Sequence, residues 1–214
     1  MMIPADFLLN KKNYTWLAKN YRITPIRRYQ CLPNQPVKGI YRTIKDQVYQ
    51  FTAERADGTG IPFSFNAGYA NGGKLLAALN RPAPPLESWQ AALNVAPGPV
   101  PNVPGPAVPP APGALCSFNA QLLELLNLFC LKHTLDPTKP SGQLFVTLNQ
   151  NPAMPHHQGA LAINTILTKY QETSAALVTW IQAAVAPAQT KNYNFSLLTI
   201  YLQGLSSPPA NIAI

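Results

Sequence analysis

Three residues near the middle of the chain, Cys130, His133 and Asp136, have the side-chain types of a nucleophile, a base and an acid. Cys130 and His133 are three positions apart and would share one face of a helix. Asp136, however, precedes Pro137, where that helix is expected to end, and nothing nearby resembles an oxyanion hole. The chain's eight acidic residues are also too scattered for paired-carboxylate chemistry. We therefore expect a protein that is not an enzyme and has no catalytic residue.

The other residues that could bind a metal or a cofactor have unsuitable spacing. His156 and His157 are adjacent, which fits neither a helical nor a strand-borne metal site, and we expect them in a loop over residues 151–158. Cys31, Cys116 and Cys130 form no CxxC pair, which excludes a zinc-ligand set and a disulfide framework. The glycine-rich stretch 66–73 lacks Walker or dinucleotide-binding spacing and reads as a loop. We predict no metal and no cofactor.

Basic and aromatic residues alternate in the first third of the chain. Such residues can hold phosphates and stack on bases, so they are candidate contacts to an anionic partner. The candidates are Arg22, Arg27, Arg28, Tyr29, Lys38, Arg42 and Lys45. The alternative is that the tyrosines pack in a sheet while the arginines are solvated or meet an acidic protein surface. Strand alternation favours this alternative, because it mixes apolar and basic residues on one face.

The charge of the chain is confined to its first part. Residues 1–82 hold 12 Lys/Arg and four Asp/Glu, whereas the rest holds four of each. The formal net charge of +8 therefore belongs to the first 82 residues. Such a balance predicts an anionic neighbour, either nucleic acid or an acidic protein.

The composition is poor in charge. Charged residues make up 11% of the chain, against about 25% in ordinary soluble domains. Asn and Gln outnumber the charged residues. Because interface cores are depleted in Lys, Glu and Asp, we expect a subunit of a larger assembly rather than a free monomer.

The local patterns predict an α+β protein of several parts. Residues 1–20 form an N-terminal arm or helix. Residues 21–81 form a small basic antiparallel β-sheet or barrel. Its predicted strands are residues 21–31, broken near Pro25, a hairpin of residues 40–44 and 48–52, and a further strand at 61–65. A short helix over 74–79 ends this module.

A proline-rich connector, residues 82–113, holds 11 of the chain's 23 prolines. Residues 86–95 have the pattern of two helical turns. Residues 96–112 are predicted to be extended polyproline II that reaches roughly 50 Å, at about 3.1 Å per residue. This piece is apolar, so we expect it to lie on a protein surface, with Pro99, Val100, Val103 and Val108 as interface residues.

A helical module follows over residues 114–205. Ser117 is a plausible N-cap for a helix over 118–134. Residues 143–149 suggest a short strand or a packed extended piece, 159–186 one long helix and 194–203 an amphipathic helix. The tail 206–214 is predicted to be extended, with Ile212 and Ile214 seated in a groove on another copy of the chain.

No apolar run reaches the roughly 20 residues that span a bilayer, and Met1–Asn10 lacks the basic start of a secretory signal. We therefore expect a protein of the host cytoplasm or of a virion. The function predicted is that of a non-enzymatic structural or assembly protein, most concretely a virion or phage-particle component, whose partners are other protein subunits. The alternative is a nucleic-acid-binding accessory protein that uses the basic β module.

Overall fold

The computed structural model describes residues 3–90, 115–133, 140–185 and 190–214. The four predicted interface residues of the connector, Pro99, Val100, Val103 and Val108, lie outside these ranges. The fold is mixed α+β, as predicted.

The chain divides into two compact units. Unit 1 comprises Met1–Ser88 with Phe129–Asn149, and unit 2 comprises Trp89–Leu128 with Gln150–Ile214. Residues 129–149, placed by the sequence patterns in the helical module, thus belong with the basic N-terminal part.

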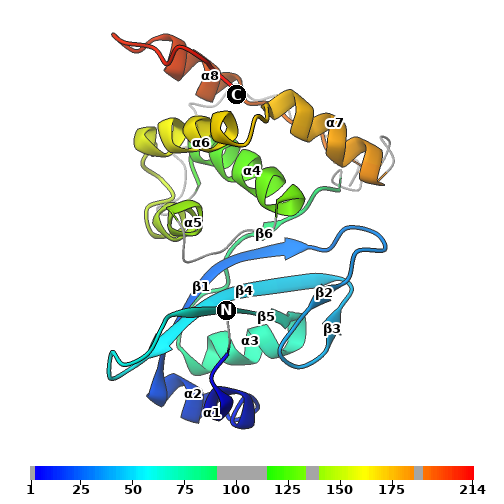
Figure 1. Ribbon diagram of the computed structural model, residues 1–214, viewed down its shortest axis with the longest axis vertical. Coiled ribbons are helices and arrows are strands. Elements are labelled where there is room, and N and C mark those ends of the chain that lie inside the picture. The colour runs from blue at the N-terminus through cyan, green and yellow to red at the C-terminus, as the bar shows by residue number, and fades with distance from the viewer. Residues whose placement is uncertain (1–2, 91–114, 134–139, 186–189) are drawn as a thin grey trace, which may run out of the picture. The chain divides into compact units, whose positions relative to one another are not determined.

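Unit 1 is built on a four-stranded sheet in the order β5-β4-β1-β6 (Figure 1). β1 (Tyr21–Gln30) and β5 (Phe63–Gly68) both pair antiparallel with β4 (Gln47–Arg55). β6 (Leu86–Glu87) runs parallel to β1, so the first residues of the helix predicted over 86–95 form a strand, and residues 91–95 lie outside the described ranges. Pro84 and Pro85 precede β6 and favour extended backbone. The described strands form an open sheet and no closed barrel.

The predicted hairpin between residues 40–44 and 48–52 does not form. β3 (Thr43–Ile44) pairs instead with β2 (Val37–Lys38) in a separate two-stranded sheet. β4 is nine residues long and pairs with β1 along its whole length, from Tyr21 opposite Arg55 to Gln30 opposite Gln47. The long pairing provides far more backbone hydrogen bonds than a two-residue strand offers.

One face of the sheet packs on three short helices, which lie on the same side of it in Figure 1. They are α1 (Ala5–Leu9), α2 (Tyr14–Asn20) and α3 (Tyr69–Ala78). Alternate strand residues supply an aromatic core, in which Phe7 meets Tyr21 and Phe63 edge to face at 4.9 Å. The segment 66–73, predicted as a loop, is the end of β5 followed by the start of α3.

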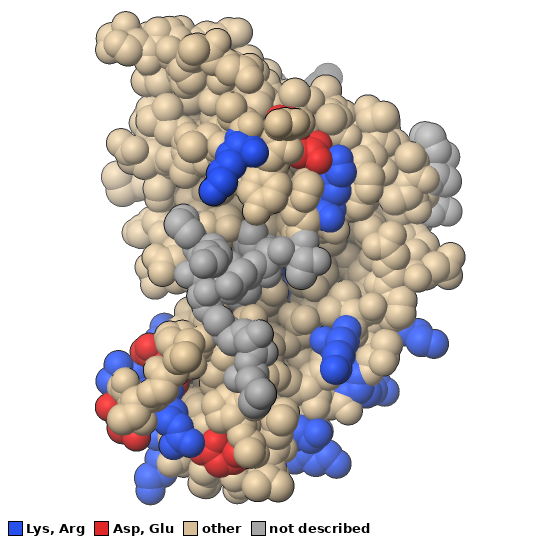
Figure 2. All heavy atoms as spheres, in the orientation of Figure 1, with Lys and Arg blue, Asp and Glu red and all other residues tan. Residues whose placement is uncertain are grey.

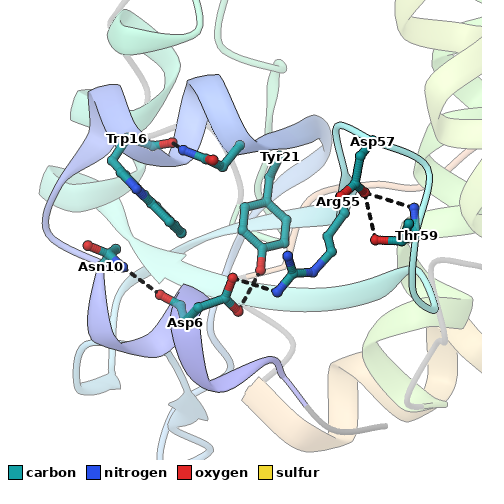
Figure 3. Close-up of polar contacts among 8 residues, drawn as sticks. Asp6, Asn10, Trp16, Tyr21, Arg55, Asp57 and Thr59 are labelled. Atoms are coloured by element: carbon teal, nitrogen blue, oxygen red, sulfur yellow. Dashed lines mark hydrogen bonds and ion pairs between the residues drawn. The ribbon is translucent and has the colours of Figure 1, made fainter.

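Asp6 fixes α1 to the sheet (Figure 3). Its two carboxylate oxygens accept hydrogen bonds from the Tyr21 hydroxyl at 2.9 Å and from Arg55 Nη2 at 2.6 Å. Tyr21 and Arg55 face each other on β1 and β4, so one carboxylate ties the helix to both strands. Burial and the hydrogen bond to Asp6 raise the pKa of Tyr21 to about 12, so the phenol keeps its proton.

β1 contains a bulge between Pro25 and Arg27. Pro25 pairs with Phe51 but Arg27 pairs with Gln50, which leaves Ile26 as an extra residue. The Ile26 carbonyl accepts a hydrogen bond from Asn149 Nδ2 at 3.0 Å. Because side chains alternate along a strand, the extra residue reverses which face each later side chain occupies.

Five helices make up most of the remainder: α4 (Ser117–Lys132), α5 (Pro140–Gln150), α6 (His157–Lys169), α7 (Ser174–Val185) and α8 (Ser196–Gln203). α5 replaces the strand predicted at 143–149. Its buried residues Leu144, Phe145 and Leu148 have helical spacing, which outweighs the β-branched content of the stretch.

The long helix predicted over 159–186 is two helices, α6 and α7. Gln171 has a positive φ of 56° just after α6 ends. The Thr173 hydroxyl then accepts a hydrogen bond from the Ala176 amide at 3.1 Å, which caps the start of α7. The polar run between the two apolar stretches therefore ends α6 and caps the start of α7.

The carboxylate of Asp6 gives a stability prediction. Replacing Asp6 by Ala should lower the free energy of unfolding by about 1 kcal/mol, because a charged acceptor is lost from a half-exposed site. The pKa of Tyr21 is higher in the fold than its usual value near 10. The hydrogen bond from Tyr21 to Asp6 therefore contributes fully to the stability of the wild-type protein below about pH 10. This contribution is lost as the pH rises toward 12 and the phenol loses its proton.

Urea denaturation checks this prediction, with Asp57→Ala as the matched control. Asp57 bonds only Thr59, two residues away, and should matter less. An Asp6→Ala variant as stable as the control would show that the carboxylate does not hold α1 in place.

Candidate functional site

The seven residues predicted to contact an anion do not share one surface. Arg27 and Tyr29 lie on the face of the sheet opposite to α1–α3, and both are buried. Arg27 is 3% exposed, its Nε donates to Gln50 Oε1 at 3.0 Å, and its guanidinium lies 4.1 Å from the centre of the Tyr29 ring. These two side chains therefore have little surface to offer a large partner.

Arg27 forms part of a polar row that crosses three strands. It pairs with Gln50 on β4, which pairs with Asn66 on β5. The row lines a pocket of about 250 Å³ together with Tyr29 and the two buried thiols, Cys31 and Cys130. Asn66 Oδ1 is buried without a hydrogen-bond partner. At this volume the pocket is slightly smaller than the usual small-molecule site.

The thiols of this pocket are protonated. Burial raises the pKa of Cys130 to about 12 and raises that of Cys31 above its ordinary value. A buried neutral thiol is a poor nucleophile, because the thiolate is the reactive form. His133 stacks on the Phe129 ring at 4.8 Å, and Asp136 lies outside the described residues.

Three exposed cations lie together on the β2–β3 hairpin. Lys38 is the last residue of β2, whereas Arg42 and Lys45 flank β3. Val37 and Ile44 point the other way, where Ile44 is 3% exposed. Among the described residues, no ion pair joins these three cations to an acidic side chain. Figure 2 shows Lys and Arg atoms gathered over this hairpin, with no acidic side chain among them in that view.

Arg28 lies on the opposite face from Arg27 and is held by two tyrosines. Its guanidinium is 5.3 Å from the Tyr49 ring centre and 5.2 Å from that of Tyr69. Its Nη2 donates to Gln47 Oε1 at 2.7 Å. The Tyr69 ring stacks on Tyr49 at 6.4 Å and is 56% exposed.

Tyr69 is the residue of this group that the sequence patterns missed, because the stretch 66–73 reads as a loop. Gly72 was the sequence clue to this helix, because a Cβ atom at that position would overlap the Tyr49 ring. Such a close approach indicates a helix lying directly on the sheet. Tyr69 begins that helix.

Arg22 stands apart from the hairpin. Its Nη1 lies 3.5 Å from Glu54 Oε1, and its Nη2 donates to the Ala56 carbonyl at 3.1 Å. The structure thus brings Lys38, Arg42 and Lys45 together, places Arg28 with Tyr69, and pairs Arg22 with an acid.

Unit 2 has the contrasting surface. Its charged residues are Glu124, Lys169, Glu172 and Lys191, and Lys191 Nζ pairs with Glu124 Oε1 at 2.7 Å. The predicted loop histidines serve the fold: His156 caps α6 by accepting from the Gly159 amide at 2.9 Å, and His157 stacks on Tyr201 at 4.5 Å.

The tail with Ile212 and Ile214 is tied to its own unit, and the predicted contact of these two residues with another copy of the chain stays a prediction. The buried Asn164 amide bonds both the Asn211 carbonyl at 3.0 Å and the Ala213 amide at 2.8 Å. The Ala213 carbonyl accepts from the Ser174 amide at 2.8 Å. These bonds leave Ile212 and Ile214 half-buried, so only part of each side chain faces outward.

Comparison of the chain with protein-family models, with curated proteins and with solved structures gave no match. Within the described ranges, no group of three or more His, Cys, Asp or Glu side chains is placed to hold a metal ion. No described helix has the length and apolar character needed to cross a bilayer.

The thiols give a prediction about reactivity. In the native protein at pH 8, iodoacetamide should modify the half-buried Cys116 well before Cys31 and Cys130, whose burial hinders access and keeps them protonated. Peptide mass spectrometry after timed quenching gives the three rates, and the unfolded chain serves as the control in which the three rates should converge. If Cys130 in the native protein reacted as fast as Cys116, the prediction would be wrong and Cys130 would be a candidate nucleophile.

Proposed function

We propose that this chain is a non-enzymatic structural subunit of a larger assembly, most concretely a component of a virion or phage particle. The observation that carries the proposal is the surface of unit 2, which has very few charges and two helices that are apolar on more than their buried side. On this proposal the partners are other protein subunits, and the protein works in the host cytoplasm or in the particle.

α7 is the clearest element of that surface. Its 12 residues, SAALVTWIQAAV, include no charge. Only Leu177, Ile181 and Val185 are buried, which is a single stripe at four-residue spacing. Outside this stripe α7 carries alanines, Val178 and Trp180 besides the neutral polar residues Ser174, Thr179 and Gln182. A helix with apolar residues beyond one stripe is often covered on more than one side. The outer face, with Ala176 and Ala183 exposed, is suited to packing against another subunit.

α8 repeats the pattern at a second place in unit 2. It buries Leu198 and Leu202, whereas Ile200 is 64% exposed and Leu197 is 39% exposed. Its sequence, SLLTIYLQ, is also free of charge. Depletion of charge is the compositional mark of an interface core, and unit 2 has it across 105 residues with four charges.

Unit 1 has a different role in this proposal. It holds all of the formal net charge, with the exposed cations of the β2–β3 hairpin free of acidic partners within the described part of the chain. Such a surface is suited to an anionic component of the same assembly. The uncharged unit would then bind protein and the basic unit would bind the anion.

Sedimentation of the purified chain tests the proposal. Without its partners the wild-type chain should self-associate or be poorly soluble, because the apolar faces of unit 2 are then left in water. The variant Ala176→Glu with Ala183→Glu, which charges one face of α7, should shift the population toward monomer and raise the solubility several-fold.

The matched control adds the same two charges to unit 1, as Ala77→Glu with Ala78→Glu on exposed positions of α3. Both variants have the same net charge, so a difference between them reports the position and not the overall charge. A wild-type chain that stays a soluble monomer at high concentration would overturn the proposal.

A further inference from the structure

The β2–β3 hairpin and the Arg28–Tyr69 stack adjoin each other at one end of the sheet. Gly68 lies against Ile44: a methyl group added to Gly68 would be 3.6 Å from an Ile44 side-chain carbon. Tyr69 follows Gly68 directly, and Lys45 follows Ile44. The Gln47 side chain, two residues after Lys45, holds the Arg28 guanidinium. The exposed Tyr69 and the exposed cations of the hairpin therefore lie at the same end of the sheet in unit 1.

The cations of this surface have the freedom to meet phosphates. Lys38, Arg42 and Lys45 are all exposed, and within the described ranges none of their side chains pairs with an acid. The acidic residue closest in sequence is Asp46, also exposed, which leaves a local excess of two positive charges over Lys38, Arg42, Lys45 and Asp46. A local cluster of cationic side chains without acidic partners attracts a polyanion at long range.

Tyr69 adds a feature that an acidic protein surface would not need. Its ring contacts Tyr49 and the Arg28 guanidinium, yet the residue as a whole is 56% exposed. An aromatic ring of this kind, beside an arginine and at the same end of the sheet as exposed cations, is suited to the stacking of unpaired bases. The bases of a duplex are already stacked on each other and cannot lie on it.

We infer that this surface binds single-stranded nucleic acid, with phosphates at Lys38, Arg42 and Lys45 and a base on Tyr69. The inference goes beyond the proposed structural role, because it names the anionic partner and the residues that meet it. It involves unit 1 alone, and it can fail while the assembly through unit 2 holds.

Fluorescence anisotropy with the full chain tests this inference. The probes are a labelled single-stranded oligothymidine and a labelled duplex of the same length, each titrated over a series of salt concentrations. Wild-type protein should bind the single strand more tightly than the duplex, and the affinity should fall as salt rises. The triple variant Lys38→Gln, Arg42→Gln, Lys45→Gln should flatten the salt slope by about two, because each phosphate contact contributes about 0.7.

The controls are matched for charge and for side-chain type. Lys19→Gln, Lys74→Gln, Arg81→Gln removes three exposed cations of unit 1 away from the hairpin and should leave most of the affinity. Tyr69→Ala should weaken single-strand binding by roughly tenfold through lost stacking and leave the salt slope unchanged. Tyr170→Ala, which removes a 53% exposed tyrosine of unit 2, should have no effect.

Several results would overturn the inference. They are an absence of binding at low salt, equal affinity for the duplex, an unchanged affinity in Tyr69→Ala, or equal losses in the two triple variants. Preference for an acidic polypeptide such as polyglutamate over the oligonucleotide would also overturn it. The sedimentation of Tyr69→Ala should match that of wild type, which keeps this test separate from the test of assembly.

Discussion

The bulge in β1 is the constraint on which the arrangement of unit 1 depends. Up to Pro25, the strand places Tyr21, Ile23 and Pro25 toward the helices, opposite Arg55, Ala53 and Phe51. In a regular strand without the bulge, Ile26 would pair with Gln50, Arg27 would face Tyr49, and Arg28 would fall on the other side. The bulge therefore decides which of two adjacent arginines is buried in the polar row and which one stacks on the tyrosines beside the hairpin.

The two units are stabilised by different kinds of side chain. Unit 1 places its aromatic side chains in a core around Phe7 and leaves most of its cations exposed to solvent. Unit 2 uses buried amides in place of charges. Asn119 Nδ2 donates to the Met154 carbonyl at 2.7 Å, its Oδ1 accepts from the His156 amide at 2.8 Å, and Asn164 holds the tail. Neutral amides satisfy buried backbone groups without adding surface charge, which keeps the outside of unit 2 suitable for protein contact.

Much of this could be predicted from the sequence where the pattern was local. The α+β class, the strand around residues 48–52, the helix starting near Ser117 and the uneven distribution of charge all follow from short-range signals. The partners of the strands did not follow, because alternation identifies a strand but not its neighbour. The stretch at Thr43–Ile44 had the same alternation as β4 and too few residues to compete for β1.

The site was harder to predict for the same reason. Arg27 and Arg28 are equivalent in the sequence, and their separation depends on a bulge for which Pro25 gave only a hint. Tyr69 was hidden in a glycine-rich stretch, although the close approach of Gly72 to Tyr49 explains why glycine stands there. Asn164 gave no signal, because its role is to bond a tail 47 residues further along the chain.

The central claim is that the two units have separate partners, one anionic and one apolar. Sedimentation velocity of the wild-type chain mixed with a labelled single-stranded oligonucleotide, repeated over a salt series, tests it most directly. Salt screens charge contacts but leaves apolar contacts intact. The account predicts that the oligonucleotide is released as salt rises while the protein remains self-associated. Self-association that is lost at the same salt concentration as the oligonucleotide would contradict the account, because one charged surface would then serve both partners.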